Sequence, residues 1–379
     1  MEYRFPEGFF WGSATAAYQV EGGIENNDWA EAAKQGKVPA AGKATDHYNR
    51  YEEDFDIVKK LNQNAHRFSI EWARIEPEEG RFNEKEIGHY RKVISALRER
   101  GIEPFVTLWH FTLPLWFSRL GGFENKKSPF YFSRYCEHVV KNLGDQVKFW
   151  ITINEPMVYF WESYIKKDWP PFKRNIFLFR KIMKNLIYSH IEAYKKIKEV
   201  DSDSQIGIAK NNADFDTPGI IFKSHRRLFW NHYFLKKIFK HQDFIGLNYY
   251  FHKHFGYRFY EEKSALGWPI YPKGIYHVLL ELKKYNKPVY ITENGLADTK
   301  DEKRANFIKE HLKWVHKAIQ EGMDIRGYFY WSFLDTFEWD KGFEPRFGLV
   351  ELNYETMERK IRPSAYEYAK ICKENKLEI

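Results

Sequence analysis

Short apolar runs alternate with longer amphipathic stretches about eight times along this chain. The runs have the length and the aromatic or β-branched content of buried strands, and they begin at Phe9, Ala65, Glu103, Phe149, Gln205, Phe244, Pro288 and Ile325. Between them, stretches such as 84–100, 129–143 and 301–322 place apolar residues at i, i+3 and i+4 opposite polar faces, which is typical of surface helices. This alternation predicts a parallel sheet covered by helices.

The number and continuity of these units favour one closed barrel. No stretch rich in Pro, Gly or Ser divides the 379 residues, so we expect a single (β/α)₈ barrel domain over residues 1–379 rather than a doubly wound sheet. No GxGxxG or GxxxxGK[ST] pattern follows any of the runs, which disfavours nucleotide binding.

Two of the predicted strands end in a carboxylate. FWITINEP places Glu155, and PVYITENG places Glu293, at the tip of a run that is otherwise apolar. An unpaired carboxylate is costly to bury, so both tips must open onto water or onto a partner. In a barrel all such tips meet at the C-terminal face, where active sites lie.

Other strand tips are also polar or aromatic. Alone, each such residue is more often structural, but together at one end of a barrel they predict a site. The set comprises Arg67, Glu71, Trp109, His110, Asn154, Asn248, Tyr249, Tyr250, Asn294, Trp331, Glu338 and Trp339.

Two facing carboxyl groups suit the cleavage of a glycosidic bond. One acts as nucleophile and the other as general acid/base, and a separation of ~5 to 5.5 Å gives retention of configuration. A nucleophile must be ionised, which Arg67 and Tyr250 would favour at Glu293. An acid must be protonated, which an apolar setting and a second carboxylate would favour at Glu155. We therefore assign Glu293 as the nucleophile and Glu155 as the general acid/base. The order of the two glutamates along the chain does not by itself distinguish these roles.

The chain resembles glycoside hydrolase family 1, the β-glucosidase and β-galactosidase family of retaining (β/α)₈ barrels. The resemblance runs nearly end to end and is specific because the strings occur in order. They are FFWGSATAAYQVEGG, TDHYNRYEEDFDIVKKLNQNAHRFSIEWARIEPEEGRF, TLWHFTLPLWF, WITINEP, IGLNYY, YITENG and YFYWSFLDTFEWDKGFEPRFGLV.

The resemblance implies roles at matching positions. Glu155 in the NEP string corresponds to the acid/base, and Glu293 in TENG to the nucleophile, which Arg67 and Tyr250 would orient. Trp331 would form the platform under the sugar, and Phe347 an aromatic edge of the pocket. The residues that would hold the sugar are Gln19, His110, Asn154, Glu338 and Trp339.

Single positions argue against two branches of this family. The thioglucosidase branch has Gln at the acid/base position, where this chain has Glu155. Phosphoglycosidases usually have Ser at the position of Glu338 and a lysine nearby, and Glu338 would repel a phosphate. We therefore expect a neutral sugar, with Lys341 as the one feature that points the other way.

The chain is shorter than usual members of the family. We expect the missing residues to come from shortened loops in the 165–275 region, which normally shape the aglycone side of the pocket. Shorter loops would leave the site more open, with room for longer or bulkier aglycones.

Composition and charge exclude other classes of protein. The net charge of +8 is spread along the chain, and the basic stretches 173–198 and 223–241 have helical periodicity, so solvated helix faces are favoured over nucleic-acid binding. Cys136 and Cys372 are far apart in sequence, which argues for a reducing compartment without disulfides. Without a signal peptide or membrane span in the sequence, we expect a soluble cytoplasmic protein.

The sequence therefore predicts a retaining exo-β-glycosidase that needs no metal and no cofactor. We expect β-glucosides to be the main substrates, with possible action on β-galactosides and β-fucosides, as small glycosides or short oligosaccharides. The alternative is a catalytically weakened sugar-binding protein on the same fold. A third hypothesis is a basic, aromatic nucleic-acid binder. The oligomeric state stays open.

Overall fold

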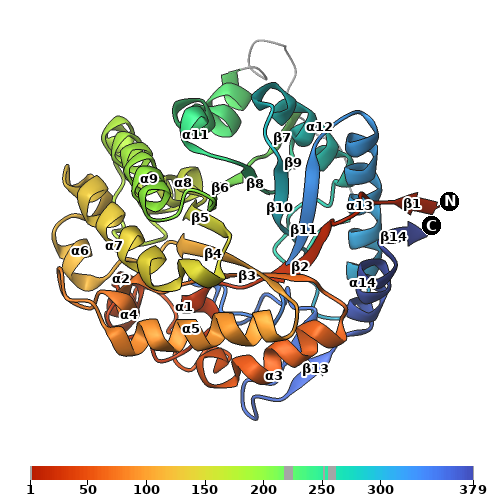
Figure 1. Cartoon of the computed structure of the whole chain (residues 1–379), viewed down its shortest axis with the longest axis horizontal. Coiled ribbons are helices and arrows are strands. Elements are labelled where there is room, and N and C mark those ends of the chain that lie inside the picture. Colours follow the sequence, from red (N-terminus) through yellow and green to blue (C-terminus); the bar gives the residue numbers. More distant parts are fainter. Residues whose placement is uncertain (1, 217–224, 251, 255–261, 379) are drawn as a thin grey trace.

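Eight parallel strands close into a barrel (Figure 1) in a computed structural model that describes residues 2–216, 225–250, 252–254 and 262–378. The order around the barrel is β10, β11, β2, β3, β4, β5, β6 and β8. All eight predicted strands are confirmed, and each begins within one residue of its expected start. Their bounds are β2 Phe10–Ala14, β3 Ala65–Ser69, β4 Glu103–Trp109, β5 Phe149–Asn154, β6 Gln205–Asn211, β8 Ile245–Asn248, β10 Val289–Asn294 and β11 Ile325–Trp331.

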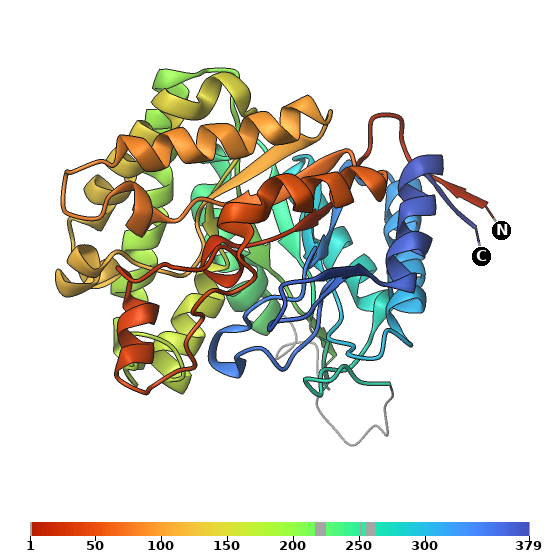
Figure 2. The ribbon, with the colours of Figure 1, turned by 90° about the horizontal axis from the view of Figure 1, so that it is seen from below.

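Helices surround the barrel on its outside (Figures 1 and 2). The stretches 84–100, 129–143 and 301–322 form α5, α7 and α13, as their periodicity predicts. The helices are α1 Ala17–Val20, α2 Asp28–Lys34, α3 His47–Lys60, α4 Trp72–Ile75, α5 Glu84–Glu99, α6 Leu115–Arg119, α7 Ser128–Leu143, α8 Pro156–Trp161, α9 Phe179–Val200, α11 Tyr233–Ile238, α12 Pro272–Leu282, α13 Arg304–Gln320 and α14 Pro363–Glu374.

The two basic stretches differ from the simple helices that their periodicity predicts. In 173–198 the α-helix begins only at Phe179, because the Asn175 side chain accepts from the Phe177 backbone N–H and caps a separate 3₁₀ turn, η4 Ile176–Leu178. In 223–241 the described part begins with helical residues at 225–226 and continues through the π-helical turn η5 Arg227–His232, α11, and the 3₁₀ turn η6 Phe239–His241. Residues 223 and 224 lie outside the described residues.

Three short strand pairs lie outside the barrel. β1 Glu2–Arg4 pairs antiparallel with β14 Lys376–Glu378, so the two chain ends lie side by side (Figure 1). β12 Val350–Leu352 pairs antiparallel with β13 Arg359–Ile361, and β7 Asp214–Asp216 pairs parallel with β9 His252–His254. Strands of three residues are too short to give a periodic signal, so the sequence does not predict them.

An aromatic cluster fills the barrel near the N-terminal ends of its strands. Phe105 and Phe149 stack with their ring centroids 4.2 Å apart, and Phe10, Tyr290 and Phe329 surround them. All are buried or nearly so. These rings fill the interior of the barrel and separate its C-terminal end from a second hollow of about 470 Å³ at the N-terminal end, which Phe10, Phe149 and Tyr290 also line.

Part of the expected loop shortening cannot be placed. Of the 165–275 region, residues 217–224, 251 and 255–261 lie outside the described residues. The described part between β5 and β6 runs through α8, the π-helical turn η3 Glu162–Lys166 and η4 directly into α9.

Two glycines give a matched test of this packing. A Cβ on Gly12 in β2 would lie 2.5 Å from the Ala65 carbonyl oxygen and 2.8 Å from the Phe329 ring, whereas a Cβ on Gly88 in α5 would meet nothing within 4 Å. We expect Gly12→Ala to lower the free energy of unfolding by about 1–3 kcal/mol through overpacking. Gly88→Ala should raise it by about 0.5–1 kcal/mol. Chemical unfolding measures both, and equal effects would contradict this packing.

Candidate active site

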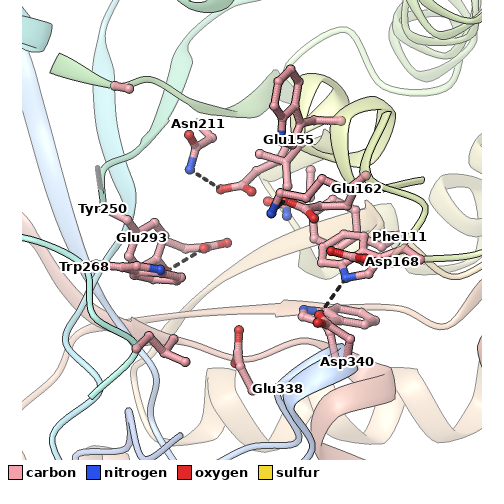
Figure 3. A pocket seen from close by; sticks show the side chains of 18 of the residues that line it. Phe111, Glu155, Glu162, Asp168, Asn211, Tyr250, Trp268, Glu293, Glu338 and Asp340 are labelled. Carbon is pink, nitrogen blue, oxygen red and sulfur yellow. Dashed lines mark hydrogen bonds and ion pairs between the residues drawn. The ribbon is translucent and has the colours of Figure 1, made fainter. Parts of the chain in front are cut away.

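A cavity of about 600 Å³ opens at the C-terminal ends of the barrel strands (Figure 3). The ends of β5, β6, β10 and β11 all contribute to its wall, as the barrel geometry predicts. Of the residues that the sequence predicts to form the site, most line this cavity. These are His110, Asn154, Glu155, Tyr250, Glu293, Trp331, Glu338, Trp339 and Phe347.

The carboxyl groups of Glu155 and Glu293 project into this space from different parts of the barrel, with that of Glu338 pointing into it as well (Figure 3). Glu293 belongs to β10. Glu155 follows β5 with a left-handed backbone (φ 45°), and Pro156 then begins α8. A left-handed non-glycine residue costs about 1–2 kcal/mol. The surrounding strands and helix hold this conformation, and β5 ends just before it, at Asn154.

Glu293 accepts hydrogen bonds on both carboxylate oxygens. The guanidinium of Arg67 donates to Oε1 at 2.5 Å, and the Tyr250 hydroxyl donates to Oε2 at 2.8 Å. Arg67 is only 1% exposed, so its charge lies against Glu293 with little screening by water. Both contacts place a hydrogen-bond donor against the carboxylate, and one of the donors carries a positive charge. Arg67 stands behind the cavity wall and reaches the site through this contact.

Among the described residues, no such cation is in hydrogen-bond contact with Glu155. Its Oε1 accepts from the side-chain amides of Asn248 at 2.7 Å and Asn211 at 3.2 Å, which favour the ionised form. Burial has the larger effect, and the charge of Glu293 adds to it, so the pKa of Glu155 is raised to about 7. At neutral pH the two carboxyls thus differ in environment, one paired with a cation and one desolvated.

Lys210 is a further charge near Glu155. Its ammonium is fully buried, donates to the Asn211 carbonyl oxygen and lies 5.6 Å from the centre of the Trp230 ring. Burial lowers the pKa of Lys210 to about 7, against the attraction of Glu155. In turn its positive charge acts to lower the pKa of Glu155.

One end of the cavity is polar and buried. Gln19 stands behind the lining, and its Nε2 donates to the Phe337 carbonyl at 2.7 Å and to Glu338 Oε2 at 3.2 Å. Burial, with the charges of Glu293 and Asp340, raises the pKa of Glu338 to about 8.

Asn154 and His110 complete this end. Asn154 Oδ1 accepts from Arg67 at 2.7 Å, and its amide nitrogen lies 3.3 Å from His110 Nε2. Burial and the Arg67 charge hold the pKa of His110 well below its usual value, so the imidazole is neutral. Within the described part of the chain, His110 Nδ1 and Gln19 Oε1 have no hydrogen-bond partner. Unpaired buried polar atoms of this kind suit a ligand rich in hydroxyl groups.

Flat rings border the polar end. The imidazole of His110 lies nearly parallel to both Trp331 and Trp339, at centroid distances of 5.9 and 6.0 Å. Phe347 packs 6.2 Å from Trp268, which in turn lies 5.9 Å from Tyr250. Rings in this arrangement offer apolar faces beside hydrogen-bonding groups.

Several strand-tip residues lie outside the cavity. Glu71 accepts from the Thr112 hydroxyl at 2.9 Å, and the Trp109 indole donates to the Thr112 carbonyl. Asn294 donates to the carbonyl of Tyr249, whose own hydroxyl donates to the Tyr271 carbonyl. These four residues support the loops and helices around the site, since their side chains leave the strands toward the helix layer or adjacent turns.

Asn211 is the cavity residue in contact with Glu155 that the sequence reasoning missed. It ends the run QIGIAKN as the last residue of β6, so the same strand-tip argument would have found it. Asn248, noted only as a strand tip, also contacts Glu155 and accepts from the Thr292 hydroxyl at 2.6 Å.

The described residues were also searched for other kinds of site. None of their helices combines the length and apolar character needed to cross a membrane. Nor does this part of the chain bring together three or more His, Cys, Asp or Glu side chains that could hold a metal ion.

Comparison with known proteins identifies the family. The profile of glycosyl hydrolase family 1 matches residues 1–219 and 228–377. The chain belongs to glycosyl hydrolase family 1. β-Glucosidase A of Thermotoga maritima is 36% identical over 441 aligned positions, which cover 99% of each chain. That alignment is longer than the 379 residues here, so the relative has segments that this family member lacks.

Solved structures of the family have the same fold. The β-glycosidase from Pyrococcus horikoshii superposes with a TM-score of 0.94 at 40% identity, covering 100% of this chain and 97% of its own. The Thermotoga maritima β-glucosidase in complex with deoxynojirimycin gives a TM-score of 0.94 at 36% identity, covering 99% and 100%. The predicted family, barrel fold and short length are all confirmed.

Two charge-removing variants test the electrostatics around Glu155. Glu293→Gln removes the neighbouring negative charge, so the pKa of Glu155 should fall below about 7 toward 4.5 without reaching it, because burial remains. Lys210→Met removes a buried positive charge and should raise the pKa of Glu155. Carbon-13 NMR titration of labelled glutamate side chains measures both. Shifts in the same direction in the two variants would contradict this account.

Proposed function

We propose that this chain is a retaining exo-β-glycosidase that acts mainly on β-glucosides. The observation that carries this proposal is the contrast between two carboxyls in one cavity. Glu293 is hydrogen-bonded to Arg67 and Tyr250, whereas burial and the charge of Glu293 raise the pKa of Glu155 to about 7. One carboxyl is thus suited to attack as an anion and the other to give up a proton.

In the first step Glu293 acts as the nucleophile. A carboxylate oxygen of Glu293 bonds to the anomeric carbon while the bond from that carbon to the leaving oxygen breaks. Glu155 transfers its proton to the leaving oxygen, so the aglycone departs as a neutral alcohol. Arg67 and Tyr250 orient the attacking carboxylate, and Arg67 keeps Glu293 beside Asn154 through contacts to both.

In the second step Glu155 acts as a base. The ester at Glu293 no longer carries a negative charge, so one of the causes that raise the pKa of Glu155 is gone and the carboxylate form is favoured. Glu155 takes a proton from water as the water oxygen attacks the anomeric carbon and the ester bond breaks. Two inversions give net retention and restore Glu155 to its protonated state.

The buried polar end would hold the terminal sugar. Gln19 and Glu338 are in contact with each other and could each bind a pair of neighbouring hydroxyls, with Trp339 beside them. Asn154, fixed through its oxygen by Arg67, presents its amide nitrogen toward His110 and would bind the 2-hydroxyl. Trp331 would serve as the platform for the ring, and Phe347 as an aromatic edge. A pocket of this kind takes one terminal residue, which supports exo action.

Two features support a neutral sugar. If Glu338 binds the sugar as we propose, a phosphate on the 6-position would meet its carboxyl group, and Lys341 is paired with Asp340 at 2.5 Å. The β-glucosidases among the relatives support glucosides as substrates. Gln19 and Glu338 could serve either epimer at the 4-position, so we also expect action on β-galactosides and β-fucosides.

Replacing the nucleophile tests the mechanism directly. In Glu293→Ala we expect hydrolysis of 4-nitrophenyl β-glucoside to fall about a thousandfold or more, because the covalent intermediate cannot form. Azide should restore activity by entering the vacated space and should yield the α-glycosyl azide. In Glu155→Ala, azide should instead attack the glycosyl-enzyme and yield the β-glycosyl azide. NMR of the products distinguishes the anomers.

Turnover without any change of product in azide would contradict these assignments. A well-folded wild-type protein that binds glucose but cleaves no β-glycoside would contradict the proposed function and favour a sugar-binding protein on the same fold.

The pH dependence tests the acid/base. Activity requires protonated Glu155, whose pKa is about 7 in the free protein, so kcat/KM should decline above about pH 7. In Glu155→Gln this alkaline decline should flatten with activated aryl glycosides. Glu162→Gln is the matched control, because Glu162 also lines the cavity and has a carboxyl pKa raised by burial. A decline lost in the control and kept in Glu155→Gln would show the assignment to be wrong.

A further inference from the structure

A chain of side-chain amides links Arg67 to the carboxyl group of Glu155. The guanidinium of Arg67 donates to Asn154 Oδ1 at 2.7 Å. The side-chain nitrogen of Asn248 lies 3.3 Å from that same oxygen and 2.7 Å from Glu155 Oε1. Asn154 is 1% and Asn248 0% exposed, so these amides have no bulk water as an alternative partner. A fixed pattern of donors and acceptors therefore runs from the cation to the carboxyl group.

The charge of Arg67 sets the direction of each amide. A guanidinium has only N–H donors, so the atom of Asn154 that faces it is the carbonyl oxygen. Asn248 in turn presents its NH₂ group to that oxygen, and its own carbonyl oxygen accepts from the Thr292 hydroxyl at 2.6 Å. The NH₂ group has two N–H bonds, one for Asn154 and one for Glu155. Glu155 Oε1 is therefore met by a donor.

Asn211 adds a second donor to the same oxygen. Its side-chain nitrogen donates to Glu155 Oε1 at 3.2 Å (Figure 3), whereas Glu155 Oε2 has no hydrogen-bond partner among the described residues. In a protonated carboxyl group one oxygen carries the hydrogen and donates, and the other is a carbonyl oxygen that accepts. An oxygen approached by two N–H groups takes the part of the carbonyl oxygen. This arrangement leaves Oε2 as the oxygen that carries the hydrogen.

We propose that Asn248, directed by Arg67 through Asn154, is a positioning residue that keeps the acid hydrogen of Glu155 on Oε2. This inference rests on the proposed glycosidase function and deepens it. In the first step the bond between Oε2 and hydrogen breaks as the leaving oxygen takes up the proton. Without the amide donors the hydrogen would divide between the two oxygens, and part of the protein would hold it on the side of the amides.

The same amides also serve the second step, in which Glu155 is an anion. N–H donors stabilise the negative charge, and both Asn248 and Asn211 act to lower the pKa of Glu155. A substitution at Asn248 leaves the other titratable groups around this carboxyl in place. Those that interact electrostatically with it are Glu293, Lys210, Glu338 and Tyr250.

Leaving groups of different acidity test the inference. Phenyl β-glucoside needs a proton from Glu155 as its bond breaks, whereas 2,4-dinitrophenyl β-glucoside releases a stable anion and needs none. We expect Asn248→Ala to lower kcat/KM for the phenyl substrate by about tenfold relative to the dinitrophenyl substrate, because general acid catalysis depends on where the proton is held. Both substrates carry the same sugar, so any disturbance of sugar binding through Asn154 cancels in this ratio.

The pH profile gives a second readout. Loss of a donor to the ionised form raises the pKa of Glu155, so the decline of kcat/KM above about pH 7 should move to higher pH in Asn248→Ala. Damage to the structure alone would lower the rate without this movement. Asn294→Ala is the matched control, since Asn294 is also a buried asparagine at a strand end, bonded to the Tyr249 carbonyl and the Tyr328 hydroxyl. Its leaving-group ratio and pH profile should equal those of the wild type.

Infrared spectroscopy reads the carboxyl group directly and needs no substrate. Below about pH 6 most of Glu155 is protonated, since its pKa is about 7, and subtraction of the Glu155→Gln spectrum isolates its C=O stretching band. Hydrogen bonds to a carbonyl oxygen lower this frequency, so the band should rise in Asn248→Ala and rise less in Asn211→Ala. The side chain of Asn211 makes no other hydrogen bond in the described residues, so its replacement should leave the fold intact.

The outcomes separate this inference from the proposed function. A folded wild type that cleaves no β-glucoside overturns the proposed function, and the inference with it. Hydrolysis with an unchanged leaving-group ratio in Asn248→Ala, or with an equal change in Asn294→Ala, overturns the inference alone. A C=O band that stays in place in both Asn248→Ala and Asn211→Ala also overturns it. Circular dichroism checks the folding of each variant, and if Asn248→Ala does not fold, the band of Asn211→Ala decides.

Discussion

The buried guanidinium of Arg67 is the interaction on which the rest of the site depends. It donates to Glu293 on β10, to Asn154 on β5, to the Thr107 hydroxyl on β4 at 3.1 Å and to the Thr292 carbonyl at 3.1 Å, while its own backbone belongs to β3. A buried cation is stable only where several acceptors surround it. Here those acceptors come from strands across the barrel, so Arg67 fixes their ends relative to one another. The positions of Glu293 and Asn154 follow from that constraint.

The same cation explains why three carboxyls in one cavity have different surroundings. Only Glu293 is paired with Arg67. Glu155 and Glu338 are desolvated near its negative charge, and their pKa values are raised to about 7 and about 8. A cavity in which all three were ionised would be strongly destabilised by like charges in a region of low dielectric. Pairing one carboxylate with Arg67 therefore gives the three groups unlike surroundings, and this asymmetry is what acid and nucleophile roles require.

Sequence patterns could predict the barrel and most of the cavity because both depend on local signals. Each strand has an apolar run of its own, and a barrel brings strand ends to one face whatever the loops do. Sequence patterns could not tell that Trp331 lines the cavity whereas Trp109 and Asn294 do not. A position at the end of a strand indicates which end of the barrel a residue occupies, but not the direction in which its side chain points. The pairing of β1 with β14 joins opposite ends of the sequence through three residues each, without any local signal. Lys210 was also hidden, since its burial beside Trp230 depends on η5 packing over the strand end.

The short length of the chain is consistent with this division between strand ends and connections. Residues of the polar end are tied into the barrel or its immediate turns, where hydrogen bonds such as those of Arg67 and Asn248 cross between strands. Other parts of the cavity lining come from segments that connect the strands, such as α8 and η5, and connecting segments tolerate deletions far better than strands do. Differences in length between members of the family can therefore fall in the connections and leave the polar end of the cavity unchanged.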